Sequence, residues 1–191
     1  MSAPRPAVGE CSPPAPDGAF RCLYRSFIPS AGIVAECRSE RDCRAGHYYG
    51  RPEDATWFTP PTGLATLPRP EVIWHTANLA EIRVGGAGGA TASYFFQATR
   101  KRTTAARAGV LAVDTRRALV ATAEPPALVI RQMWSGREVL RLEREWTPGL
   151  SLAQALPALR FDPDGRLSFT WLRGAEREPV SERVSVPSVP R

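Results

Sequence analysis

The most constraining feature of this sequence is a short alternating segment near its C-terminus. Leu167, Phe169 and Trp171 alternate with polar residues over positions 166–171. This period of two gives an extended strand one apolar face and one polar face. The segment follows Pro-Asp-Gly at positions 163–165, where the proline presets φ for a turn and the glycine accepts a positive φ. The sequence therefore predicts a β-hairpin whose three apolar side chains face a core.

Short β-prone segments of the same kind recur between residues 71 and 186, separated by turn-forming residues. One or two helical turns are predicted at 151–156, ended by the proline that follows. Many short strands joined by tight turns predict an all-β fold, an antiparallel meander that forms a sandwich or a small barrel. The predicted strands span residues 71–75, 79–84, 92–99, 109–114, 118–123, 127–134, 138–146, 158–162, 166–172 and 180–186.

The first 70 residues have a different composition. They hold eleven of the 19 prolines and all four cysteines, and they show little apolar alternation. We therefore predict an irregular, Pro- and Cys-rich N-terminal arm over residues 1–70, followed by an antiparallel β domain over residues 71–191. The arm is expected to contain at most one short helix, because Ser39 and Asp42 form a capping pattern for a helix that would end near Gly46.

The four cysteines, Cys11, Cys22, Cys37 and Cys43, predict two disulfides, because an even number is confined to a segment with little core of its own. Three pairings are open. Reduced cysteines are one alternative, and a zinc site of Cys22, Cys37, Cys43 and His47 is another, although the chain lacks the C-x-x-C pairs typical of such sites. We expect no metal or other cofactor. Paired cysteines favour an exported protein, periplasmic or extracellular, and reduced cysteines would favour the cytoplasm.

The chain has a formal net charge of +6, and one cluster of basic residues stands out: Arg100, Lys101, Arg102 and Arg107. We interpret the cluster as a candidate site for an anionic partner, either an acidic protein surface or an anionic membrane surface. Aromatic residues at 94–96 could stack on nucleic-acid bases. Nucleic acid is nevertheless not favoured, because these aromatics lie on a predicted strand and are better explained as core.

No pattern in the sequence indicates catalysis. His47 and His75 are the only histidines, and no G-x-S-x-G sequence accompanies them. The glycine-rich residues 85–89 precede a predicted strand, whereas a phosphate-binding loop precedes a helix. Whether the protein is an enzyme is uncertain on these grounds, and a non-catalytic role is favoured.

These features lead to one functional hypothesis and two alternatives. The hypothesis is a non-catalytic accessory or structural subunit that binds a protein assembly through its N-terminal arm, its β surface or both. The alternatives are a small-molecule carrier built as a β-barrel and a hydrolase with its site at the strand ends. No apolar run is long enough to cross a bilayer, and residues 1–20 lack the apolar stretch of a signal peptide, so neither element is predicted.

Overall fold

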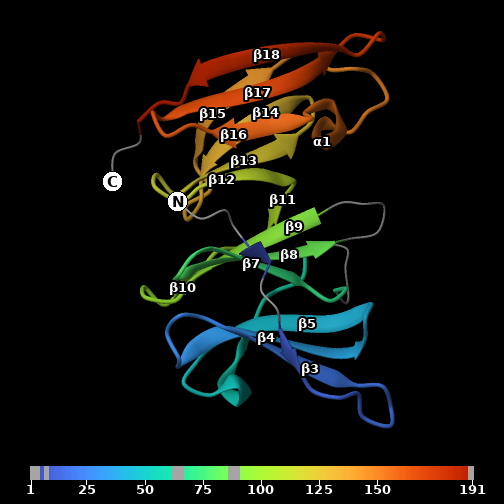
Figure 1. Ribbon diagram of the computed structural model, residues 1–191, viewed down its shortest axis with the longest axis vertical. Helices are drawn as coiled ribbons and strands as arrows, with labels where there is room; N and C mark the ends of the chain where they lie inside the picture. Colours follow the sequence, from blue (N-terminus) through green and yellow to red (C-terminus); the bar gives the residue numbers. More distant parts are fainter. Residues whose placement is uncertain (1–4, 7–8, 62–66, 86–90, 189–191) are drawn as a thin grey trace. The chain divides into compact units, whose positions relative to one another are not determined.

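The protein is nearly all β in its computed structural model, which describes residues 5–6, 9–61, 67–85 and 91–188. The chain forms two compact units, residues 1–107 and 108–191. Figure 1 shows the strands of both units. Along the order of each of the four sheets, neighbouring strands pair antiparallel. The predicted all-β, antiparallel fold is therefore confirmed.

The first sheet of unit 1 is formed by neighbours in sequence, in the order β2-β3-β4-β5-β6. A single turn of 3-10 helix, η1 (Pro52–Asp54), connects the last two strands. Because consecutive strands pair, each needs only a short connection. The strands are β2 (Glu10–Cys11), β3 (Phe20–Arg25), β4 (Ala31–Ser39), β5 (Asp42–Tyr49) and β6 (Thr56–Trp57).

The second sheet of unit 1 has the order β1-β7-β8-β9-β10, and β11 also pairs with β9. A shared apolar cluster joins this sheet to the first, since it contains Ile33 and Ala35 of one and Ile82, Tyr94 and Phe96 of the other. Unit 1 is thus a β-sandwich. The strands of its second sheet are β1 (Arg5–Pro6), β7 (Glu71–Thr76), β8 (Leu79–Gly85), β9 (Thr91–Gln97), β10 (Arg102–Thr103) and β11 (Arg107–Ala108).

The N-terminal region differs from the predicted irregular arm over residues 1–70. It contributes β2–β6, and its Cys22 and Ile33 are completely buried in the same cluster as β8 and β9. Its prolines lie mainly in the connections between strands, so their density reflects turns and not the absence of a sheet. The predicted helix after Ser39 is also wrong, because a tight turn there pairs Ser39 with Asp42 and β5 begins at once.

Unit 2 begins with a meander in the order β12-β13-β14-β15. A second sheet has the order β16-β17-β18, and helix α1 (Leu152–Ala155) lies between the two in sequence. The helix starts at a capping box, in which Ser151 and Gln154 bond to each other's backbone N–H groups. The strands are β12 (Val110–Asp114), β13 (Leu119–Glu124), β14 (Ala127–Gln132), β15 (Glu138–Glu143), β16 (Ala158–Phe161), β17 (Arg166–Arg173) and β18 (Glu178–Ser185).

The alternating segment of β17 lies at the centre of this unit. Leu167, Phe169 and Trp171 are buried with residues of β13 and β14, including Leu128 and Ile130, so their inward orientation is confirmed. The two sheets therefore pack in a sandwich-like arrangement. No sheet closes into a barrel within the described part of the chain, so the small-barrel alternative is wrong.

Candidate functional site

The four cysteines form two disulfides, Cys11–Cys22 and Cys37–Cys43. In each pair the two residues lie directly opposite one another on adjacent strands. The bonds use the sulfur atoms that the zinc alternative required. Within the described residues, moreover, no group of three or more His, Cys, Asp and Glu side chains is arranged to hold a metal ion. Two disulfides are compatible with an exported protein.

His47, the fourth ligand of the zinc alternative, lies in an aromatic cluster. Its ring centroid is 5.5 Å from that of Tyr49, 5.7 Å from that of Phe58 and 5.5 Å from that of Phe96. Burial lowers the pKa of the imidazole, because the charged form loses hydration there. These contacts give His47 a packing role in the core of unit 1.

Three of the predicted anion-binding residues are consecutive: Arg100 and Lys101 lie in the turn between β9 and β10, and Arg102 begins β10. Arg100 and Lys101 are exposed, and the Lys101 ammonium lies 5.6 Å from the Tyr49 ring centroid. The Arg102 Nε donates to the Gln97 Oε1 at 2.8 Å, and its pKa is lowered by burial and by the nearby charge of Arg100. The fourth residue, Arg107, lies apart from the turn, on β11. The turn offers two exposed cations and remains a candidate surface for an anionic partner.

A buried carboxylate that the sequence analysis missed lies on β8. Glu81 is completely buried, and its Oε2 is 2.9 Å from the His75 Nε2. Its Oε1 accepts from the Ser93 hydroxyl at 2.6 Å and from the Arg83 Nη2 at 3.2 Å. Burial by itself would raise the pKa of Glu81, but the bonds from His75 and Ser93 and the charge of Arg83 outweigh it and lower the pKa.

The order of contacts in this cluster does not match that of a catalytic triad. In a triad the histidine accepts the proton of the nucleophile and the acid orients the histidine. Here the Ser93 hydroxyl donates to Glu81, which lies between the serine and His75. Ser93 is also almost completely buried. The cluster therefore satisfies a buried charge, which is a structural role.

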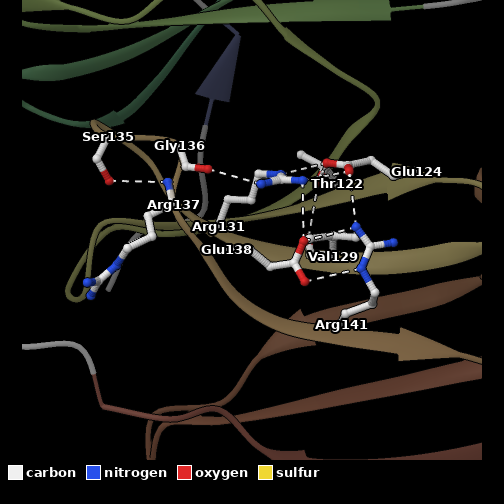
Figure 2. A network of polar contacts seen from close by, with 9 residues as sticks. All are labelled: Thr122, Glu124, Val129, Arg131, Ser135, Gly136, Arg137, Glu138 and Arg141. Atoms are coloured by element: carbon white, nitrogen blue, oxygen red, sulfur yellow. Dashed lines mark hydrogen bonds and ion pairs between the residues drawn. The ribbon is translucent and has the colours of Figure 1, made fainter.

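Arginine–carboxylate pairs also cross the first sheet of unit 2, as Figure 2 shows. Arg131 of β14 donates through Nε and Nη2 to the two oxygens of Glu124 on β13, both at 2.7 Å. The Arg131 Nη2 also lies 3.5 Å from the Glu138 Oε2 on β15, and within β15 itself Arg141 donates to Glu138 at 2.9 Å. Such cross-strand pairs stabilise neighbouring strands, and all these charges have partners within the sheet. The network is accordingly part of the sheet surface and not a site for a ligand.

One large apolar side chain, Phe27 between β3 and β4, is exposed to solvent. Its exposed fraction is 84%, and among the described residues it is the single exposed large hydrophobic side chain. The loop that carries it is well bonded: the Ser26 Oγ donates to the Ile28 carbonyl at 2.8 Å and accepts from the Ile28 N–H at 3.0 Å. The Ala31 N–H donates to the same carbonyl at 3.0 Å. A hydrogen-bonded loop therefore presents an aromatic ring to solvent.

Comparison of the chain with models of protein families, with curated proteins and with solved structures found no match. Within the part of the chain that the structure describes, no helix is long and apolar enough to span a membrane.

Proposed function

We propose that this protein is a non-catalytic accessory or structural subunit that attaches to a protein partner through its N-terminal unit. The observation that supports this most directly is Phe27, an aromatic ring that is 84% exposed on a bonded loop. Single exposed apolar residues are common. Phe27, however, is held out by a hydrogen-bonded loop, and aromatic residues, phenylalanine included, are enriched in protein interfaces.

The structure of the loop supports an anchor because it lowers the cost of binding. A side chain on a mobile loop must be ordered when the partner binds, at a cost in conformational entropy. The Ser26 bonds and the fixed φ of Pro29 already order this loop in the free protein. Phe27 can therefore enter an apolar pocket of a partner with little rearrangement.

The two disulfides support a location outside the reducing cytoplasm, where such bonds persist. The proposed site of action is accordingly an exported compartment, periplasmic or extracellular. The exposed Arg100 and Lys101 would favour an acidic partner surface by long-range attraction.

The test uses a tagged full-length chain in extracts of the cells that make it. The wild-type chain should migrate in a complex larger than its own 20.9 kDa. Phe27→Ser should weaken that complex about 30-fold, the equivalent of about 2 kcal/mol for an interface anchor. Phe27→Trp should retain it, because the larger aromatic ring still supplies apolar area.

Arg51→Ser serves as the control, since it removes another exposed side chain of the same unit. A complex that Phe27→Ser leaves intact would contradict the proposal. So would Phe27-dependent flotation with vesicles of phosphatidylglycerol, because the partner would then be a membrane and not a protein.

A further inference from the structure

Unit 1 contains an open groove at the end of its first sheet where β3 begins, β4 ends and β5 begins. Its volume is about 700 Å³, within the range of pockets that hold small ligands. Its apolar lining includes Phe20, Phe58, Leu67 and the disulfide Cys37–Cys43. Leu67 is fixed there by paired backbone bonds with Cys43, at 2.7 and 3.1 Å. The groove is therefore bounded by ordered backbone and by a covalent cross-link.

Most charged groups at the rim of the groove neutralise one another. Glu36 accepts from the Arg44 Nη2 at 2.5 Å and lies 3.5 Å from the Arg21 Nε. Arg21 also bonds to Glu53 at 3.1 Å, and the Arg44 guanidinium stacks 3.9 Å from the centroid of the Trp57 ring. A ligand that recruited these arginines would have to break existing pairs.

Among the described residues, two rim residues of opposite charge, Arg38 and Asp42, are not paired with other charged groups. Within the described part of the chain, the side chains of Arg38 and Asp42 form no hydrogen bond or ion pair. Arg38 is exposed, and Asp42 is half-buried at the start of β5. The groove thus combines an apolar floor with one available guanidinium fork and one available carboxylate.

A ligand complementary to this set needs three features: an apolar body, a carboxylate for the guanidinium and an N–H donor for Asp42. A fatty acid supplies only the first two. A peptide with apolar side chains and a free carboxyl terminus supplies all three. We propose that this groove binds the carboxyl terminus of short apolar peptides, with Arg38 receiving the terminal carboxylate and Asp42 receiving an N–H group.

The binding assay is isothermal titration of the full-length protein with the tripeptide Leu-Leu-Phe. The comparison ligands are the C-terminal amide of the same tripeptide and decanoate. Hydrogen bonds to a charged group are worth about 10- to 100-fold in affinity. The free acid should therefore bind at least about 10-fold more tightly than the amide, and more tightly than decanoate.

Single substitutions test which part of the peptide Arg38 and Asp42 each bind. Arg38→Gln should weaken binding of the free acid to the level of the amide and leave binding of the amide unchanged. Asp42→Asn should weaken binding of both tripeptides but not of decanoate. Arg41→Gln is the matched control, because Arg41 is exposed in the same turn, lies outside the groove lining and loses the same charge. None of the three changes removes a described side-chain contact, so the melting temperatures should stay equal.

Three results would overturn the proposal. The first is an absence of binding of the free acid by the wild-type protein. The second is an equal loss with Arg38→Gln and Arg41→Gln, which would indicate general charge attraction. The third is decanoate binding as tight as that of the tripeptide. The assay does not involve Phe27, so its outcome is separate from that of the partner complex.

Discussion

Replacing Glu81 by alanine should destabilise the protein far more than removing an exposed carboxylate. Glu81 is completely buried and accepts bonds from Ser93 at 2.6 Å and from Arg83 at 3.2 Å, while His75 lies 2.9 Å from its other oxygen. Alanine removes the acceptor and leaves three polar groups without their partner. Breaking a buried pair in this way typically costs about 3–5 kcal/mol.

Glu81→Gln should cost less, about 1–2 kcal/mol. The amide keeps the size of the side chain, and its oxygen can still accept from Ser93 and Arg83. What is lost is the difference between bonds to a charged acceptor and bonds to a neutral one, about 1 kcal/mol for each bond. Glu81→Gln removes the charge alone, whereas Glu81→Ala removes the charge and also leaves a cavity. Comparing the loss in free energy of unfolding for the two variants therefore separates the effect of the charge from the effect of the cavity.

The contribution of Glu81 to the free energy of unfolding should change with pH in one direction. The pKa of Glu81 is lowered from its ordinary value of 4.5 in the folded protein. Its contribution to the free energy of unfolding is therefore fully present above pH 4.5 and decreases as the pH falls through the folded-state pKa. The stability difference between wild type and Glu81→Gln should be largest near pH 7 and should shrink in acid.

The assay is urea unfolding followed by far-ultraviolet circular dichroism at pH 7 and at pH 3.5. Asp54→Ala is the control, because removing this exposed carboxylate should lower the free energy of unfolding by less than about 0.5 kcal/mol. A cost for Glu81→Ala equal to that of the control would refute a buried, bonded carboxylate. A difference between wild type and Glu81→Gln that grows in acid would refute the direction of the pKa shift.

Four further predictions concern other parts of the chain. Phe169→Ala should cost about 3–5 kcal/mol in urea unfolding, and Thr170→Ala under about 1 kcal/mol; similar midpoints would contradict the packing of β17. Reduction should add four hydrogens to the intact mass, and the bridged separations of 11 and 6 residues imply about 2–3 kcal/mol for each disulfide in thermal unfolding. A double variant, Arg100→Gln with Lys101→Gln, should abolish any weak DNA binding seen at low salt, and binding that persists at physiological salt would contradict a merely electrostatic contact. A fragment of residues 108–191 should melt cooperatively, because its core cluster is internal; a non-cooperative melt would show that this unit cannot fold alone.

The strands of residues 71–186 could be predicted because their patterns are local. Alternation in β17 and the Pro-Asp-Gly turn before it are visible within ten residues of sequence. The N-terminal sheet was harder because two of its strands are only two residues long and glycines interrupt two others. Gly46 is one of these. A Cβ atom there would lie 2.6 Å from the Thr56 carbonyl oxygen, so the glycine allows β6 to approach β5.

The candidate sites depend more on contacts between distant residues. An even number of cysteines was enough to predict disulfides, but the pairing required the strand register. Glu81 lies within a mostly apolar strand, and that unusual position was the one available signal of a buried charge. The groove combines residues from Ser12 to Leu67, and the sequence does not show which of its charged residues are already paired.

The position of each disulfide has a consequence for how the N-terminal hairpins form. Successive side chains of a strand point to opposite faces, so a hairpin misaligned by one residue would place its two sulfurs on different sides of the sheet. Such a hairpin cannot be oxidised within itself. Cys11 and Cys22, and likewise Cys37 and Cys43, lie directly opposite each other only when their strands are paired in the correct register. Oxidation of a correctly paired hairpin therefore fixes its register covalently, in a region where prolines and glycines specify the register weakly.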